Sequence, residues 1–437
     1  MLRFCLLAFA LLLTSAIAQQ PAPQTPITLQ QAIARARENE PSFAAAVANQ
    51  RVAALDHSIA RAALLPNVSY HNQVLYTQPN GARNGGGPVG SQSAPRFIAN
   101  NAVREYASQG VVNETLGLGQ VTAVSRAAAA DAVATAELEI ARRGLVSTVT
   151  SLFYQALAAD RKVDVARRAA GEASSFTNLT QQRETAREAA HADVVKAQLQ
   201  QQQRDRDLTE ALLDTQKAHL DLAVLLFPDP RTAYTLASDP MAALPARADV
   251  DEAAMRLNPE LHQAMASLRV STLDVTAARA AYLPDLGLSF AYGIDAVQFA
   301  VNGGDGVKNL GYSASATLDI PVWDWLSTQH RVRQSEILRD AARTALTATQ
   351  RRLVAQLDEF YAEASTARDQ LQSLEQSVQT AGDSMRLTRL RYSAGEATVL
   401  EVVDAQNSLT AAEIAREDGT VRYRLALTNL QLLTGAI

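Results

Sequence analysis

The chain has 437 residues, a formal net charge of −5, and only 5% aromatic residues. Arginine and glutamate are interleaved along it and form no basic cluster, so the sequence gives no sign of nucleic-acid binding. Alanine and glutamine are abundant over long polar stretches, which favours long helices over a compact globule. The single cysteine, Cys5, lies in the N-terminal apolar run, so we expect neither a disulfide nor a thiolate metal site in the mature protein.

The first residues are typical of a secretory signal peptide. Arg3 precedes the apolar run 4–13, and residues 16–18 form an Ala-x-Ala cleavage site, so we expect cleavage after Ala18. The run is too short to span a bilayer, and no later segment is a candidate membrane helix. Export without an anchor leaves two possibilities, a soluble periplasmic protein or a β-barrel.

Residues 19–227 begin with a leader rich in proline and glutamine and continue as a helix that starts at Thr28. Gln31 lies three residues after this threonine, as in a capping box, and Pro66 ends the helical pattern. The expected elements that follow are a strand at 67–77, a Gly- and Pro-rich loop at 79–101, a strand at 103–118, a long helix, a tip at 183–190 and a further helix.

Residues 228–248 contain four prolines and are expected to form a linker. The segment 249–437 then repeats the same order of elements. We expect a helix ending at Pro284, strands at 285–300 and 309–321, a long helix, a tip at 391–398 and a final helix. Trp323 and Trp325 come after the last strand; they could join an aromatic belt at a membrane interface, but their place after Pro321 favours packing at the strand-to-helix corner.

Two gapless matches show that the halves are related. Residues 183–198 and 391–406 are identical at 8 of 16 positions, and residues 41–66 and 259–284 at 13 of 26. A repeat of this length indicates gene duplication and not a solenoid. The helix-turn-helix tip is therefore present twice.

The strands of the second repeat alternate between large apolar and small or polar residues. In an exported chain this pattern is typical of the lipid-facing and lumen-facing sides of an outer-membrane barrel; a soluble sheet with one wet face is the alternative. Four strands leave two unpaired edges, which lipid does not tolerate, so the barrel would close between protomers. A dimer would give eight strands and a filled interior, whereas the twelve strands of a trimer leave room for a bore.

The long helices add a second constraint. Residues 325–391 as one helix would be on the order of 100 Å long, which no globular core requires. Ala-rich antiparallel helices of this length can instead pack side by side and continue a barrel as a helical tube across the periplasm. The two tips would then form the inner end of that tube.

The duplicated halves, the strand pairs between long helices and the tip sequence from Tyr392 to Asp404 resemble the TolC-type outer-membrane efflux protein family. The resemblance covers essentially the whole mature chain. It implies an α+β membrane protein in which a homotrimer builds a 12-stranded barrel in outer-membrane lipid, continued by a periplasmic coiled-coil barrel. It further implies a passive exit duct of a tripartite efflux pump or type I secretion system, with a periplasmic adaptor (membrane fusion protein) and an inner-membrane transporter as partners.

The resemblance also assigns roles at the tips. It implies that Tyr392 and Asp193 form a gate pair and that Glu401 and Asp404 line the constriction. Three copies would place six carboxylates around one axis and favour cations. The gate arginine of well-known members falls at Ala397, so the arginine link is absent or moved to a neighbouring arginine. The candidates for that arginine are Arg187, Arg389 and Arg391; the residues expected at the tip and adaptor contact are Arg187, Gly395 and Glu396.

Other kinds of site are not supported. The six histidines are scattered without ligand spacing, and no nucleophile motif or phosphate-binding loop is evident, so we expect no metal, no cofactor and no enzymatic activity. The alternative function is a soluble periplasmic coiled-coil adaptor or scaffold.

Overall fold

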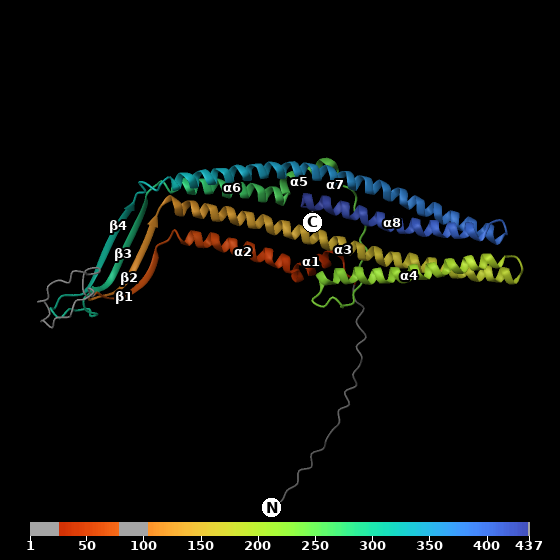
Figure 1. The fold of residues 1–437 in the computed structure, drawn as a ribbon, viewed down its shortest axis with the longest axis horizontal. Coiled ribbons are helices and arrows are strands. Elements are labelled where there is room, and N and C mark those ends of the chain that lie inside the picture. The colour runs from red at the N-terminus through yellow and green to blue at the C-terminus, as the bar shows by residue number, and fades with distance from the viewer. Residues whose placement is uncertain (1–25, 78–103, 436–437) are drawn as a thin grey trace, which may run out of the picture. The chain divides into compact units, whose positions relative to one another are not determined.

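The computed structural model describes residues 26–77 and 104–435 (Figure 1). The expected signal peptide and the expected loop at 79–101 lie outside these residues. Among the residues that are described, no helix combines the length and the apolar character needed to cross a membrane.

The chain forms two compact units, and each unit takes segments from both repeats. The first, which we call the tip unit, contains residues up to Asn39, Val146–Leu244 and Thr366–Leu425; the second, the sheet unit, contains Glu40–Leu145, Pro245–Ser365 and residues from Ala426 onward. Spatial grouping therefore differs from the division of the sequence into repeats.

The sheet unit contains one antiparallel sheet with the order β1-β2-β3-β4 (Figure 1). Each repeat supplies two adjacent strands, which confirms the four expected strands, although each is slightly shorter than its expected span. The strands are β1 (Asn67–Tyr76), β2 (Arg104–Leu116), β3 (Asp285–Ala296) and β4 (Leu310–Asp319).

The strand register separates the sheet into two unlike faces. Tyr70, Gly110, Tyr292 and Tyr312 lie in one row across the four strands, and the three tyrosines are 71%, 53% and 77% exposed. The adjacent row on the opposite face contains small and aliphatic residues, namely Ser69, Val111, Ala291 and Ser313. One face therefore presents large apolar rings to its surroundings, as the alternation of the sequence predicts.

The helix expected before each strand pair is divided in two. The first repeat has α1 (Leu29–Asn39) and α2 (Pro41–Ala62), and the second has α5 (Arg247–Leu257) and α6 (Pro259–Ala280). Each break falls before a proline, which disfavours helical backbone in the residue that precedes it. The expected capping box is confirmed at the start of α1, where the Gln31 N–H donates to Thr28 Oγ1 at 3.3 Å and the Thr28 N–H donates to Gln31 Oε1 at 3.2 Å.

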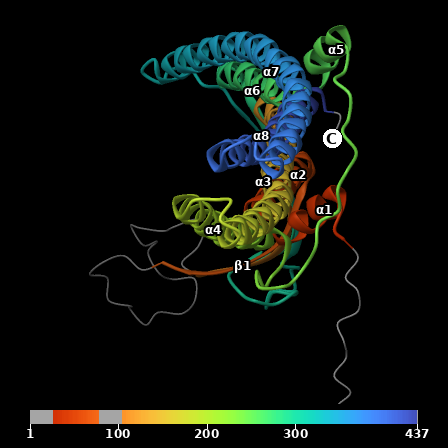
Figure 2. The same ribbon diagram turned by 90° about the vertical axis from the view of Figure 1, so that its right-hand side faces the viewer.

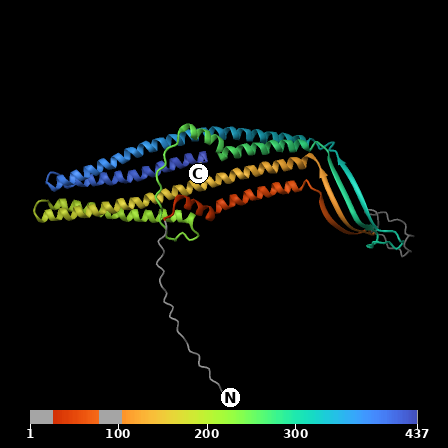
Figure 3. The same cartoon turned by 180° about the vertical axis from the view of Figure 1, so that it is seen from behind.

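The remaining helices form two antiparallel hairpins whose turns are the tips (Figures 1 and 3). Their bounds are α3 (Leu118–Thr185), α4 (His191–Leu226), α7 (Ser327–Ser393) and α8 (Val399–Thr434). Figure 2 views the chain from the tip end, with the α7/α8 hairpin and the α3/α4 hairpin turned toward the reader. Inside the tip unit, Phe153, Leu222 and Leu226 are almost fully buried.

Candidate functional site

The second tip is a helix C-terminus closed by a left-handed glycine. The Glu396 N–H donates to the Arg391 carbonyl at 2.8 Å and the Gly395 N–H donates to the Tyr392 carbonyl at 3.0 Å. Gly395 has a φ of +79°. This pair of bonds with a positive φ is the Schellman motif, in which glycine avoids the steric cost of a Cβ.

Helix α8 begins at this tip with a reciprocal cap. The Glu401 N–H donates to Thr398 Oγ1 at 3.3 Å, and the Thr398 N–H donates to Glu401 Oε1 at 3.1 Å. Arg391 forms an ion pair with Glu401 at 3.1 Å. The hydrogen bond from the Thr398 N–H is the largest of the influences that hold the pKa of Glu401 below its usual value, and Arg391 adds to it. Glu401 is therefore a capping residue as well as an exposed carboxylate.

The first tip uses the same backbone turn with different side chains. The Glu188 N–H donates to the Arg183 carbonyl at 2.8 Å and the Arg187 N–H donates to the Glu184 carbonyl at 2.9 Å. Arg187 takes the left-handed position, with a φ of 61°. The N-cap of α4 is Ala190, which has no side chain that could form a capping hydrogen bond. The two repeats thus share the backbone turn but differ in the left-handed residue and in the capping side chain.

Tyr392 packs into the core under the tips. It is 4% exposed and belongs to a cluster with Phe176, Met385 and Val402. Its ring meets that of Phe176 edge-on, with 5.1 Å between centroids. Its hydroxyl lies 3.4 Å from Thr180 Oγ1, so the tyrosine of α7 contacts two residues of α3.

Arg183 joins the two tips directly, a role that was not predicted from the sequence. Its guanidinium donates to the Tyr392 carbonyl at 2.6 Å and to the Ser393 carbonyl at 3.2 Å. The same group lies over the Tyr392 ring at 4.9 Å from the centroid. Bonds from a charged donor are stronger than neutral ones, and these two satisfy carbonyls at the C-terminus of α7. The sequence does mark this position, because Arg183 is the equivalent of Arg391 in the gapless match between the two repeats.

The structure brings only some of the predicted gate residues together. The Tyr392 hydroxyl pairs with Thr180, and within the described protomer it makes no hydrogen bond to Asp193, which lies half-buried in the first turn of α4. Asp404 is exposed and the Glu401 side chain is 43% exposed, so both carboxylates are open to solvent. Their gate roles stay predictions.

The residues expected at the tip contact are all exposed, namely Arg187, Gly395 and Glu396. Ala397, where a gate arginine would be expected, packs partly buried against the Tyr392 cluster. Of the three arginines considered for the moved link, Arg391 is the one that pairs with a gate carboxylate, Glu401.

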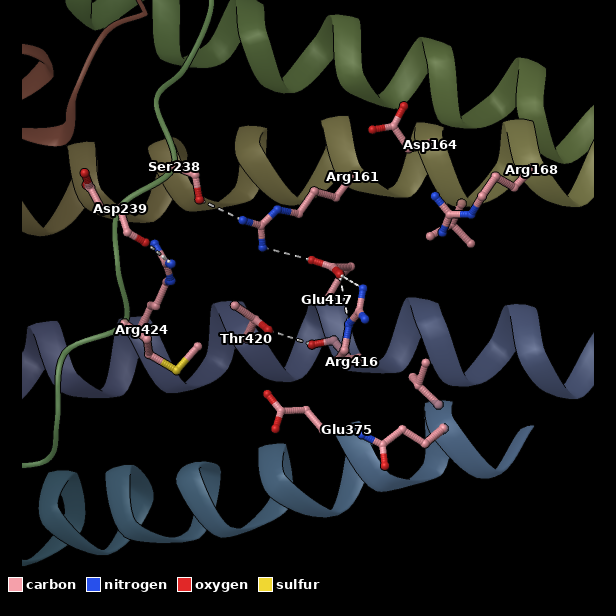
Figure 4. A pocket seen from close by; sticks show the side chains of 14 residues that line it. Arg161, Asp164, Arg168, Ser238, Asp239, Glu375, Arg416, Glu417, Thr420 and Arg424 are labelled. Atoms are coloured by element: carbon pink, nitrogen blue, oxygen red, sulfur yellow. Dashed lines mark hydrogen bonds and ion pairs between the residues drawn. The ribbon is translucent and has the colours of Figure 1, made fainter. Parts of the chain in front are cut away.

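A cavity of about 620 Å³ lies elsewhere in the tip unit (Figure 4). Arg161 reaches across it from α3, donating to Glu417 at 3.3 Å and to Ser238 of the linker at 2.9 Å. Arg424 of α8 donates to the linker carbonyl of Asp239 at 2.6 Å. These arginines bind the linker to helices α3 and α8. The charged groups that line the cavity therefore have a structural role. The described residues contain no group of three or more potential metal ligands.

Comparison with known proteins places this geometry in a family. A family model described as "Outer membrane efflux protein" matches residues 251–436. Outer membrane protein TolC of Vibrio cholerae is 25% identical over 416 residues, covering 91% of this chain and 88% of that protein. Outer membrane protein OprJ of Pseudomonas aeruginosa is 26% identical over 172 residues, and this alignment covers 39% of the chain and spans only 36% of the length of OprJ.

Solved structures show the same fold. The open state of the Neisseria gonorrhoeae MtrE outer membrane channel matches with a TM-score of 0.78 at 19% identity, covering 93% of this chain and 88% of that one. The shared fold includes the four antiparallel strands, the long helices and the duplicated halves. Together with the family model and the relatives, it identifies the chain as a member of the TolC-like family of outer-membrane efflux proteins, a family of channels located in the outer membrane with helices extending into the periplasm.

Proposed function

We propose that the chain is a passive exit duct in the outer membrane, assembled as a homotrimer, and serves a tripartite efflux pump or a type I secretion system. This proposal rests on one observation: the same chain contains an open sheet and long helical hairpins. β1 and β4 are edge strands of the described sheet, and unpaired strand edges are not tolerated in lipid. Three copies joined edge to edge would close a barrel of twelve strands with a bore.

The two faces of the sheet support a position in the membrane. One face carries exposed rings such as Tyr70 and Tyr312, which lipid could cover, while the other face carries small residues such as Ser69 and Ser313, which could line water. A soluble adaptor, the alternative function, would leave this aromatic face in water without a covering layer. Membership of the outer-membrane family argues against that alternative.

We further propose that the tips are the gate. Tyr392, Asp193, Glu401 and Asp404 would control the periplasmic entrance, and Arg183 would hold the two hairpins of one protomer together when the entrance is closed. In a trimer Glu401 and Asp404 form rings of negative charge that attract cations. Arg187, Gly395 and Glu396 are the exposed tip residues available to a periplasmic adaptor, which in turn would connect the duct to an inner-membrane transporter.

The decisive experiment is conductance of the purified protein in planar lipid bilayers. Discrete channels with a preference for cations are expected from the unmodified protein. The double variant Glu401→Ala with Asp404→Ala should weaken that preference and the block by multivalent cations. Asp383→Ala, which removes an exposed carboxylate of α7 instead of the two on α8, should not change either property. Unchanged selectivity in the double variant would contradict the gate, and a failure of the protein to form channels at all would contradict the duct.

Adaptor contact requires a separate test. A photoreactive amino acid at position 396 should cross-link a periplasmic protein in intact cells. The same label at position 375, on the lining of the linker cavity, serves as the control for non-specific capture. Cross-linking that is equal at both positions would count against adaptor binding at the tips.

A further inference from the structure

A second cavity of the tip unit is a groove of about 480 Å³ between α3, α4 and α8. Its floor contains alanines of α3 and α4, among them Ala158, Ala166 and Ala211, and we call it the alanine groove. Ile414 of α8, which is 36% exposed, adds a larger apolar side chain. The volume lies within the range of about 300–1,000 Å³ that is typical of small-molecule sites.

The α4 side of the alanine groove is acidic. Asp207, Glu210 and Asp214 lie three and four residues apart, so they share the face of α4 that lines the groove. Carboxylates four residues apart on a helix repel each other. Within the described part of the chain, Glu210 forms no ion pair or hydrogen bond, and Asp214 pairs only with Lys217, at 3.3 Å with both side chains 61% exposed. The repulsion between Glu210 and Asp214 is therefore largely unrelieved.

The basic side chains of the groove are already engaged. Lys162 of α3 pairs with Asp418 of α8 at 2.5 Å, and Arg204 pairs with Asp207 at 2.9 Å. The lining contains two basic and four acidic side chains, which leaves a formal net charge of −2. The excess negative charge falls on the two unrelieved carboxylates of α4, directly beside an apolar floor.

We propose that the alanine groove binds amphiphilic cations of drug size. The apolar body of such a molecule covers the alanine floor, and its cationic group lies beside Glu210 and Asp214. An anion would meet the excess negative charge, and a neutral molecule would leave the two carboxylates in mutual repulsion. Only a cation with apolar surface gains from both parts of the groove.

The inference deepens the proposed function and rests on it, because it names a class of cargo for the duct. Arg161 of α3 binds Ser238 of the linker, whereas the next residue, Lys162, lines the groove about 100° further around the helix. The linker would obstruct a bore if it lay inside one, so it belongs on the outside of the duct. The groove would then open toward the bore and concentrate cations in the path of export.

Equilibrium dialysis of the purified protein tests the site with two ions of nearly equal size and shape. The probe is tetraphenylphosphonium, an apolar cation, and the control is tetraphenylborate, the corresponding anion; detergent without protein is the blank. We expect saturable binding of the phosphonium ion and binding of the borate that is weaker by about tenfold or more.

Variants locate the binding in the groove. Glu210→Gln combined with Asp214→Asn keeps the shape of both side chains and should weaken phosphonium binding about tenfold. Asp383→Asn, which removes an exposed carboxylate of α7, should leave binding unchanged. Ala166→Leu fills the floor without changing any charge and should also weaken binding. Helix content measured by circular dichroism verifies that each variant is folded.

Three results would overturn the proposal: equal binding of the two ions, binding of neither ion, or phosphonium binding that survives the double variant. Binding of neither ion would leave the groove to a segment of a protein partner. Channel conductance in planar bilayers is measured on the same preparations. Channels without charge-selective binding refute the groove alone, whereas charge-selective binding without channels supports the site and refutes the duct.

Discussion

The two tips of this chain share the same backbone turn but differ in the side chains that stabilise it. Both close a long helix with the same pair of hydrogen bonds around a left-handed residue, Arg187 in one tip and Gly395 in the other. The second tip has a reciprocal cap between Thr398 and Glu401, while the first begins its outgoing helix at the uncapped Ala190. Duplication conserved the fold of the turn and left its side chains free to specialise.

The equivalent arginines show how this specialisation works. Arg391 binds residues of its own tip, pairing with Glu401 and donating to the Glu396 carbonyl at 2.9 Å. Arg183 pairs with Glu188 of its own tip at 3.5 Å, but it also crosses to the other tip and binds the carbonyls at the end of α7. The second tip is therefore stabilised by its own Arg391 and also by Arg183 of the first tip. The first tip supplies the connection between the two. We expect the first tip to be the more mobile of the two once Arg183 is released.

The largest effect should follow from Tyr392→Ala. Removing a ring that is 4% exposed leaves a cavity beside Phe176 and should destabilise the tips by about 3–5 kcal/mol. Faster hydrogen exchange of tip amides and a higher resting conductance would report this loss. Tyr392→Phe is the matched control: it keeps the ring and loses only a long hydrogen bond to Thr180, so it should change little. A large effect of the phenylalanine variant would mean that the hydroxyl, and not packing, holds the gate.

Arg183→Ala should come next, with a loss of about 1.5–3 kcal/mol in the coupling of the tips, because two charge-assisted hydrogen bonds disappear. The Arg183 side chain is only 20% exposed, so solvent screening is modest. Resting conductance should rise, and amides of both tips should exchange faster. Arg391→Ala is the control at the equivalent position; it should affect the second tip only. Equal effects of the two variants would contradict the view that Arg183 connects the two tips while Arg391 stabilises only its own.

The turns and the strands could be predicted from the sequence because they depend on local patterns. Gly395 marks a helix end, and the alternation in residues 286–294 marks a strand with two unlike faces. The equivalence to Arg391 marks the position of Arg183, but its bonds to the other tip could not be predicted, since its partners are backbone carbonyls 209 and 210 residues away and no side-chain pattern marks them. The prediction that Trp323 and Trp325 pack at the strand-to-helix corner is wrong for the protomer, where they are 67% and 84% exposed. Trp325 and Leu326 adopt left-handed backbone, which non-glycine residues seldom take and which the sequence therefore did not indicate.

Removal of the helix cap should have a smaller effect. Thr398→Ala is expected to cost about 1 kcal/mol of local stability at the start of α8, since the Glu401 N–H loses its partner. The reverse change in the other tip, Ala190→Thr, should slow exchange of the first amides of α4. If neither variant changes exchange, the difference in capping between the tips has no energetic consequence.

Acid should act on the second tip through Glu401. The pKa of Glu401 is lowered in the folded state, so its contribution to stability is present above the unfolded value near 4.5 and is lost as the pH falls through the folded value. The protection of amides at the start of α8, measured relative to their intrinsic exchange rate at the same pH, should therefore decrease below about pH 4.5. In Glu401→Gln this decrease should be absent, and its persistence there would assign the acid response to another group.

The smallest effect is expected from the left-handed positions themselves. Gly395→Arg, which copies the first tip, should cost about 1 kcal/mol because a Cβ enters a conformation with φ of +79°. In Arg187→Gly, relief of the same strain is offset by the greater flexibility of glycine in the unfolded chain, so the net change should stay within about 0.5 kcal/mol. Amide hydrogen exchange at the two turns measures the change in local stability in each variant. A gain in stability well above that range in Arg187→Gly would show that the first tip stores backbone strain that the second tip, with Gly395, does not.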